Sequence, residues 1–224
     1  MVDLKAVLFD LDGTLIDSEY FYFSNWQPIL KREFDVDLSF EGWLDHFAGH
    51  TLVRNVAYMR DLWNIQTTEE YMWKATREAY ANSNMKDIKL MPYATELLHF
   101  LKEKGVGIGL VTSSYRTTAD TVLGAHGLLD LFDFFVTRDS VTNPKPNPEP
   151  YLLGAKLTNV PYESIVAIED TTTGTTSAKD AGLFCIAASK HVVERERLKH
   201  ADLLVSDMGE IKQYFQKWLV SSNS

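Results

Sequence analysis

The sequence predicts an α/β fold: a doubly wound parallel sheet with an inserted all-helical domain. Two patterns predict it. Short apolar runs alternate with amphipathic helical stretches over most of the chain, and one long stretch near the N-terminus has helical patterns only. Strands that alternate with helices pair in parallel, and the helices cover both faces of the sheet. We therefore expect a core at residues 1–17 and 89–224 and a helical insert at residues 18–88.

The elements of the core are expected where apolar runs, prolines and glycines fall. The first strand is the apolar run from Ala6 to Phe9, which ends at acidic residues. Pro92 and Pro148 suit helix starts, and Gly105 suits a helix end. The other strands are expected at residues 106–111, 132–137, 164–168, 183–187 and 202–205, and the helices at residues 92–104, 116–126, 148–156, 174–181, 193–199 and 208–219.

The insert has aromatic and apolar residues at helical spacing. Phe23, Trp26 and Leu30 fall on one helical face, and Ser39 and Thr68 suit helix N-termini. Aromatic side chains at such spacing pack in a core more often than they bind ligands, so we expect Trp26 in a core. Two further faces of this kind consist of Val56, Met59 and Trp63, and of Met72, Thr76 and Ala79.

Charge and composition exclude several classes of protein. The 224 residues are 45% hydrophobic and 24% charged, which is globular composition. Lys and Arg number 22 and Asp and Glu 31, so the formal net charge is −9, whereas nucleic-acid binders present a basic face. The first residues are too acidic for a signal peptide, and no apolar run approaches the roughly 18 residues of a membrane helix. The single cysteine, Cys185, excludes an intramolecular disulfide. We expect a cytoplasmic protein, a monomer or weak dimer, that binds neither nucleic acid nor membrane.

Two acidic residues, Asp10 and Asp12, follow the first expected strand directly. In open α/β sheets ligands bind at the carboxyl ends of the strands, and residues two apart there can face one crevice. Two carboxylates this close repel each other unless a cation neutralises them or one holds a proton. Both conditions suit phosphoryl transfer, in which one carboxylate attacks phosphorus and the other protonates the leaving oxygen. The structural alternative is an ordinary polar turn.

Other strand ends add groups of the same chemistry. Asp170, with Glu169 before it, would complete an oxygen-only site beside Asp10, which suits Mg²⁺ better than zinc. Thr112 and Ser113 offer hydroxyl and backbone N–H groups that suit a phosphate. Helix capping is the structural alternative for both segments.

Lys145 lies between two prolines, which we expect to hold the backbone extended and direct the side chain. A carboxylate about 3 Å from one phosphate charge is repelled by about 5 kcal/mol at an effective dielectric constant near 20. Attack by an aspartate therefore needs positive charge nearby, and Mg²⁺ and Lys145 would supply it. The set is consistent with a phosphoryl-transfer site.

These motifs, in this order, resemble the haloacid dehalogenase-like hydrolases, in the branch of β-phosphoglucomutase and phosphoglycolate phosphatase, with a Rossmann-like core and a small helical cap. The resemblance covers essentially the whole chain. It implies that Asp10 is the nucleophile and a Mg²⁺ ligand, and that Asp12 is the general acid/base and a ligand through its carbonyl. It further implies that Thr112 and the Ser113 amide bind the phosphoryl group and that Lys145 bridges phosphate and nucleophile. Asp170 would be a Mg²⁺ ligand, with Glu169 a ligand or a support for one.

Departures from the family's patterns narrow the reaction. The family's dehalogenases lack an acid at the position of Asp12, and its mutases carry a histidine where this chain has Tyr22. We therefore expect a Mg²⁺-dependent phosphatase acting on a small phosphorylated metabolite, such as a sugar phosphate. A sugar-phosphate mutase, an inorganic pyrophosphatase and a non-catalytic phosphate-binding module are the alternatives. In the cap, His50 and Arg54 are candidates for substrate binding, Arg54 through a second anionic group.

Overall fold

The computed structural model describes residues 3–48, 50, 52–190 and 192–221. The chain folds into two compact units, one of Met1–Ile16 with Lys89–Ser224 and one of Asp17–Ile88. Among the described residues, none of the helices combines the length and the apolar character that crossing a membrane requires.

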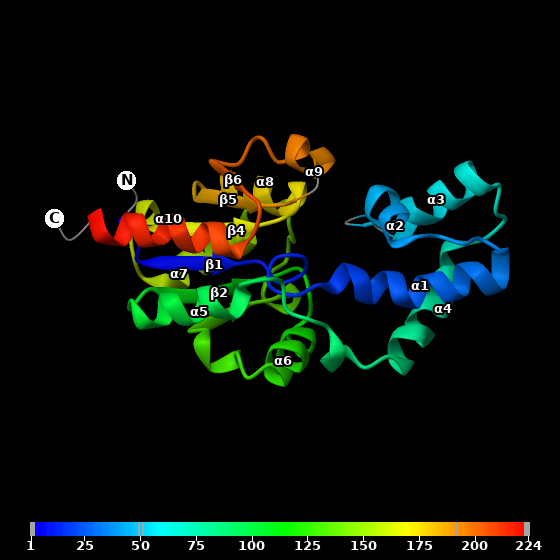
Figure 1. Ribbon diagram of the computed structural model, residues 1–224, viewed down its shortest axis with the longest axis horizontal. Helices are drawn as coiled ribbons and strands as arrows, with labels where there is room; N and C mark the ends of the chain where they lie inside the picture. The colour runs from blue at the N-terminus through cyan, green and yellow to red at the C-terminus, as the bar shows by residue number, and fades with distance from the viewer. Residues whose placement is uncertain (1–2, 49, 51, 191, 222–224) are drawn as a thin grey trace. The chain divides into compact units, whose positions relative to one another are not determined.

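The first unit is built around a six-stranded parallel sheet with the strand order β3-β2-β1-β4-β5-β6 (Figure 1). The strand order reverses beside β1, at which point a doubly wound sheet opens a crevice at its carboxyl edge. The predicted fold class is confirmed. The strands are β1 (Ala6–Phe9), β2 (Gly107–Val111), β3 (Phe134–Val136), β4 (Ile165–Glu169), β5 (Phe184–Ala188) and β6 (Leu203–Val205).

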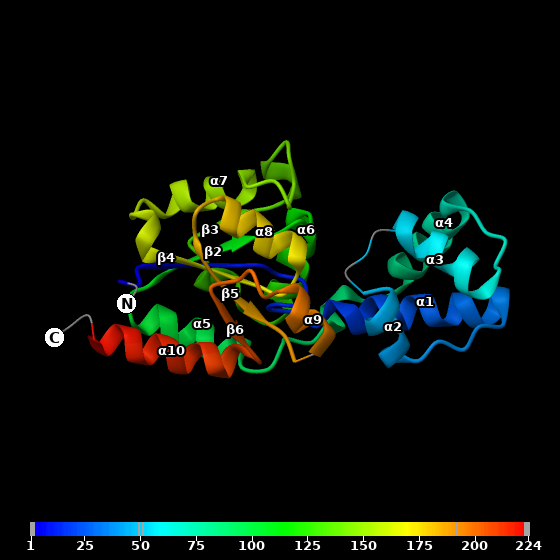
Figure 2. The same ribbon diagram turned by 90° about the horizontal axis from the view of Figure 1, so that it is seen from above.

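Helices cover both faces of this sheet. In Figure 2 the helices α7 and α8 lie on one side of the strands, and α5 and α10 lie together on the other. Strands buried on both faces carry continuous apolar sequence, as in the fully buried β1 and β4. The helices are α5 (Ala94–Glu103), α6 (Arg116–Ala125), α7 (Glu149–Thr158), α8 (Thr172–Asp180), α9 (Val192–Arg197) and α10 (Met208–Ser221).

The register of the sheet sets which residues reach its carboxyl edge together. Phe9 of β1 is level with Leu110 of β2 and with Ile168 of β4. The next residues along these strands are therefore level too, and the Asp10 N–H still donates to the Ile168 carbonyl at 3.0 Å. Cys185 is a buried member of the apolar core under the sheet.

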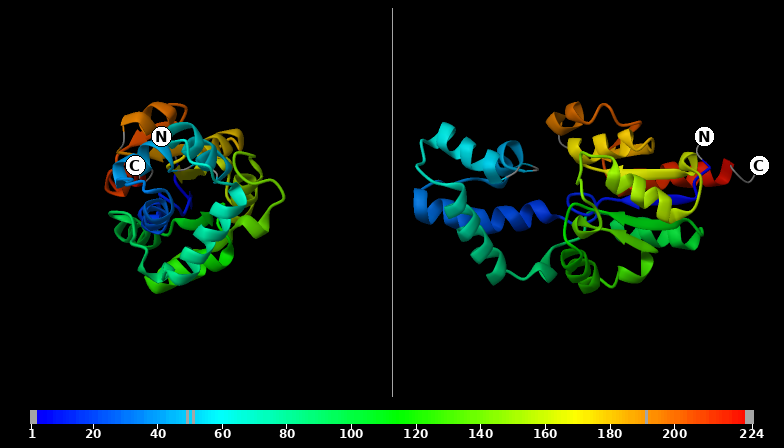
Figure 3. Two further views of the ribbon diagram at one scale, coloured as in Figure 1. Left: turned by 90° about the vertical axis from the view of Figure 1, so that its right-hand side faces the viewer. Right: turned by 180° about the vertical axis from the view of Figure 1, so that it is seen from behind.

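The second unit is helical throughout its described part. Its helix α1 packs against α2 and α4, and α3 packs against α4 (Figure 3). Trp26 lies in the core of this unit, as predicted, and Ser39 and Thr68 cap α2 and α4 with their side chains. The helices are α1 (Ser18–Phe34), α2 (Phe40–His46), α3 (Leu52–Trp63) and α4 (Glu69–Asn82), with a short 3₁₀ turn at Met85–Asp87.

The element boundaries differ from the predicted ones by up to two residues. Helix α8 begins at Thr172, two residues before the predicted start, because the Thr171 side chain accepts from the Gly174 N–H and caps the helix earlier. Helix α5 begins at Ala94. Strand β3 is shorter than predicted at both ends.

Candidate active site

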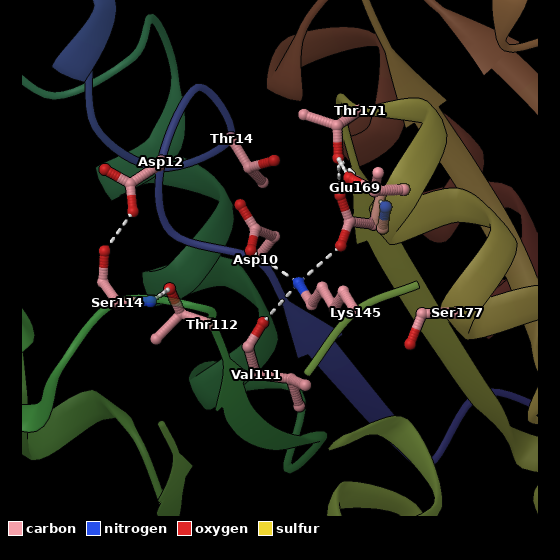
Figure 4. A network of polar contacts seen from close by, with 12 residues as sticks. Asp10, Asp12, Thr14, Val111, Thr112, Ser114, Lys145, Glu169, Thr171 and Ser177 are labelled. Carbon is pink, nitrogen blue, oxygen red and sulfur yellow. Dashed lines mark hydrogen bonds and ion pairs between the residues drawn. The ribbon is translucent and has the colours of Figure 1, made fainter. Parts of the chain in front are cut away.

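Lys145 joins three neighbouring strand ends at the carboxyl edge of the sheet. Its Nζ donates to Asp10 Oδ1 at 2.6 Å, to Glu169 Oε1 at 2.6 Å and to the Val111 carbonyl at 2.8 Å (Figure 4). These three acceptors are the residues that the register places level on β1, β4 and β2. An ammonium group has three donors, so the strand register itself provides a complete set of partners for Lys145.

The backbone around Lys145 is a turn, so the prediction of an extended segment is wrong. The Asn147 N–H donates to the Pro144 carbonyl at 3.0 Å, and the Lys145–Pro146 peptide bond is cis. This hydrogen bond closes a four-residue turn from Pro144 to Asn147, which reverses the chain direction. Lys145 therefore reaches the sheet edge from a turn and not from an extended segment.

Glu169, the last residue of β4, is fully buried, and its carboxyl group lies beside the first turn of α8. Its Oε1 accepts from Lys145 and from the Tyr151 hydroxyl at 2.8 Å, and its Oε2 accepts from the Asp170 N–H and the Thr171 hydroxyl. A Cβ atom at Gly174, in the first turn of α8, would fall 2.0 Å from this carboxyl group. Glycine is therefore required there, and it allows the carboxylate to sit at the positive end of the helix.

Among the residues that the structure describes, Asp10, Glu169 and Asp170 form a group that could hold a metal ion. Each offers one oxygen, and these oxygens lie within 4.8 Å of one another. Asp170 accepts from the Thr14 hydroxyl at 3.1 Å, and a Cβ atom at Gly13 would lie 2.0 Å from its Oδ2. An all-oxygen set of acidic ligands suits a hard cation such as Mg²⁺. Both Glu169 oxygens already accept hydrogen bonds from protein donors. Asp10 and Asp170 are therefore better suited than Glu169 to bind a metal ion directly.

Burial shifts the pKa values in this cluster. Burial raises the pKa of Asp10 from 3.8 to about 7, although Lys145 opposes the shift. Burial works to lower the pKa of Lys145, but Asp10 and Glu169 outweigh it, so its pKa lies above the ordinary value. Burial also raises the pKa of Tyr151 well above its ordinary value, so its hydroxyl stays a neutral donor to Glu169.

We expect the stability of the metal-free protein to fall with rising pH because of Asp10. Below about pH 4 the carboxyl is protonated in both the folded and unfolded states. Between about pH 4 and about pH 7 only the folded state keeps the proton, so the free energy of unfolding falls by up to about 1.4 kcal/mol per pH unit. Denaturant unfolding of the wild type and of Asp10→Asn in chelator measures this difference. Parallel pH profiles of the two proteins would contradict it.

Asp12 is turned to a different partner from Asp10 (Figure 4). Its Oδ2 accepts from the Ser114 hydroxyl at 2.6 Å, whereas the Asp10 carboxylate faces Lys145. The strand has ended at Phe9, so the two-residue alternation of a strand no longer applies at Asp12. The two carboxylates therefore lie at the same edge of the sheet but have separate surroundings.

Thr112 and Ser113 follow β2 at the same edge. Thr112 is buried, its N–H continues the ladder to the Val136 carbonyl at 2.9 Å, and its hydroxyl oxygen accepts from the Ser114 N–H at 3.0 Å. The Ser113 side chain is exposed. Thr112 thus places its hydroxyl at the sheet edge, and the exposed Ser113 follows it in the same loop.

His50 and Arg54 lie in the helical unit, at the connection from α2 to α3 and on α3. His50 is exposed, and its N–H donates to the Phe47 carbonyl. The Arg54 guanidinium donates to the His46 carbonyl and lies 4.9 Å from the centre of the Tyr58 ring. Arg54 is thus a half-buried cation packed on its own unit, and its part in substrate binding stays a prediction.

Sequence reasoning missed two partners of the predicted residues. Tyr151, a fully buried side chain of α7, supports Glu169, and it carried no signal beyond the spacing of six residues from Lys145. Ser114 follows the predicted phosphate-binding pair Thr112 and Ser113, and its hydroxyl donates to Asp12. Both contacts join residues far apart in the chain, and periodicity does not report such pairs.

The comparisons with known proteins agree with this arrangement. A family model for haloacid dehalogenase-like hydrolases matches residues 7–188. A validoxylamine A 7'-phosphate phosphatase of Streptomyces hygroscopicus subsp. limoneus is 33% identical over 93% of this chain and 96% of its own. A phosphorylated carbohydrates phosphatase of Thermotoga maritima is 30% identical over 80% of this chain and 82% of its own.

Two further proteins similar to this chain are named for other activities. A pyrophosphatase of Oceanobacillus iheyensis is 26% identical over 94% of this chain and 96% of its own. The crystal structure of a β-phosphoglucomutase from Clostridium difficile is 25% identical, with a TM-score of 0.68 over 98% of each chain. The chain therefore belongs to the haloacid dehalogenase-like hydrolase family, in its branch of phosphatases, pyrophosphatases and β-phosphoglucomutases.

Proposed function

We propose that this enzyme is a Mg²⁺-dependent phosphatase that hydrolyses a sugar phosphate or similar small phosphomonoester through an aspartyl-phosphate at Asp10. The observation that carries the proposal is the buried contact of Lys145 with Asp10 and Glu169 at the sheet edge. This contact places the Asp10 carboxylate beside the positive charge of Lys145. Attack on an anionic phosphoryl group requires positive charge at that place.

The reaction has two balanced steps. Asp10 attacks phosphorus, the bond from phosphorus to the leaving oxygen breaks, and Asp12 gives that oxygen its proton. Water then attacks the aspartyl-phosphate, Asp12 takes a proton from the water, and the bond from phosphorus to Asp10 breaks. Inorganic phosphate and an alcohol leave, and both carboxyl groups return to their starting states.

The remaining polar groups stabilise the transferring phosphoryl group. The Lys145 ammonium offsets negative charge on it, and the Thr112 hydroxyl and the Ser113 N–H donate to its oxygens. Asp10 and Asp170, with the Asp12 carbonyl, would hold Mg²⁺, and Glu169 would support them. When bound, Mg²⁺ supplies positive charge that lowers the repulsion between nucleophile and phosphate.

The choice of substrate is assigned to the helical unit, residues 18–88, acting as a cap. A cap supplies side chains to the part of the substrate that does not react, and His50 and Arg54 are the proposed ones. Two relatives support a carbohydrate-type substrate, since one acts on validoxylamine A 7'-phosphate and the other on phosphorylated carbohydrates, as their names state.

A substrate panel tests the proposal. We expect phosphate release from at least one sugar phosphate in Mg²⁺, and loss of that release in chelator. The panel contains hexose and pentose phosphates, phosphoglycolate, nucleoside monophosphates and pyrophosphate, with Asp10→Asn as the control for contaminating phosphatase. Release that persists in chelator, or no release by the folded enzyme from any compound, would contradict the proposal.

A sugar-phosphate mutase is the second candidate, favoured by the similarity to β-phosphoglucomutase. A mutase returns the phosphoryl group to another hydroxyl of the sugar and does not pass it to water. Conversion of a hexose 1-phosphate into its 6-phosphate, dependent on a hexose bisphosphate and faster than phosphate release, would replace the phosphatase by the mutase.

A further inference from the structure

We propose that Ser114 is a positioning residue, which orients the carboxyl group of Asp12 for proton transfer. The inference rests on the proposed function and assigns a role to a residue that lies outside the family's short motifs quoted above. The observation that supports the inference directly is the hydrogen bond from the Ser114 hydroxyl to Asp12 Oδ2, at 2.6 Å. This length is typical of a hydroxyl donating to a carboxylate.

Ser114 is itself held by its backbone on both sides. Its N–H donates to the Thr112 hydroxyl oxygen at 3.0 Å, and its carbonyl accepts from the Arg138 N–H at 2.9 Å. The first contact fixes the loop after β2, and the second ties that loop to the segment after β3. The position of the Ser114 hydroxyl is therefore set by the sheet edge, so this hydroxyl can fix a carboxyl group in a loop that has left its strand.

The contact also distinguishes the two oxygens of Asp12. Oδ2 accepts the Ser114 hydrogen, while Oδ1 is buried and has no hydrogen-bond partner among the residues that the structure describes. A proton carried by Asp12 is then placed on Oδ1. In the first step it moves from Oδ1 to the leaving oxygen as the phosphorus–oxygen bond breaks, and in the second Oδ1 takes a proton from the attacking water.

Two kinds of substrate need the Asp12 proton to different degrees in the first step, and this difference separates a positioning role from a structural one. An aryl oxide such as p-nitrophenolate leaves without a proton, whereas an alkoxide does not. The ratio kcat/KM covers the reaction only up to loss of the leaving group. Misplacing the Asp12 proton therefore lowers kcat/KM for an alkyl phosphate and spares it for p-nitrophenyl phosphate.

The experiment compares Ser114→Ala, Ser114→Thr and the wild type on p-nitrophenyl phosphate and on the alkyl phosphate that is hydrolysed fastest in the panel. For Ser114→Ala we expect kcat/KM to fall about 10- to 100-fold on the alkyl phosphate and less than about threefold on the aryl phosphate. Hydrolysis of the aspartyl-phosphate also slows, so p-nitrophenolate appears in a burst of about one equivalent per enzyme.

Ser114→Thr keeps a hydroxyl and should restore most of the loss. Thr117→Ala, an exposed hydroxyl on α6, is the matched control and should behave as the wild type.

The outcomes separate this assignment from the proposed function. Equal falls of kcat/KM on both substrates, or no fall on the alkyl phosphate, would overturn the role of Ser114 while leaving the phosphatase intact. If Ser114→Ala does not fold, Ser114→Thr decides. Equal falls of kcat/KM on both substrates for a folded Ser114→Thr would also overturn the role of Ser114. A wild type that turns over neither substrate would overturn the proposed function, and the assignment with it.

Discussion

Replacing Asp10 by asparagine is expected to abolish phosphate release while leaving the protein folded. The amide has nearly the shape of the carboxyl group, but it is too weak a nucleophile to attack phosphorus. We expect turnover to fall by at least about 10⁴-fold, as for the loss of a covalent nucleophile in other enzymes. Lys145 keeps its contacts with Glu169 and the Val111 carbonyl, and one buried charge is removed, so the fold should persist.

Mass spectrometry of acid-quenched enzyme provides the direct test. The wild type should carry one phosphoryl group on Asp10 during turnover, and Asp12→Ala should accumulate it with p-nitrophenyl phosphate because hydrolysis has lost its base. Asp180→Asn, an exposed carboxylate at the end of α8, is the matched control and should keep full turnover. Substantial phosphatase activity in Asp10→Asn would remove Asp10 as the nucleophile.

Replacing Lys145 by alanine is expected to remove both activity and much of the stability. The Lys145 and Glu169 side chains are 5% and 0% exposed, and Asp10 is similarly buried. The substitution leaves two carboxylates buried with no cation between them. Breaking a buried ion pair in this way costs about 3–5 kcal/mol of unfolding free energy.

The measurement is denaturant unfolding in chelator and again in excess Mg²⁺. A cation bound by Asp10 and Asp170 would offset part of the repulsion, so Mg²⁺ should stabilise Lys145→Ala more than it stabilises the wild type. Lys179→Ala is the matched control: its pair with Asp202 is about as short, 2.7 Å against 2.6 Å, but is about one-third exposed. Its loss should cost at most about 1 kcal/mol. Equal costs for the two lysines would contradict the buried-charge argument.

The order of strands and helices, and the place of Asp10, Thr112, Lys145 and Asp170 on strand-end loops, followed from the sequence alone. The reason is that these features depend on local sequence. Apolar runs mark strands, glycines mark helix ends, and polar residues directly after a strand mark the loops at the sheet edge. The carboxyl ends of parallel strands lie at one edge, so a correct order of elements already gathers these residues.

What the tertiary structure decided is which of the gathered groups touch. The register that makes Asp10, Val111 and Glu169 level gives Lys145 three acceptors, and no period in the sequence encodes that register. The Tyr151 support of Glu169 and the Ser114 contact with Asp12 likewise join residues 18 and 102 positions apart. Such contacts arise from the packing of α7 on the sheet and the pairing of β1 with β2, and both bring together segments that lie far apart in the chain.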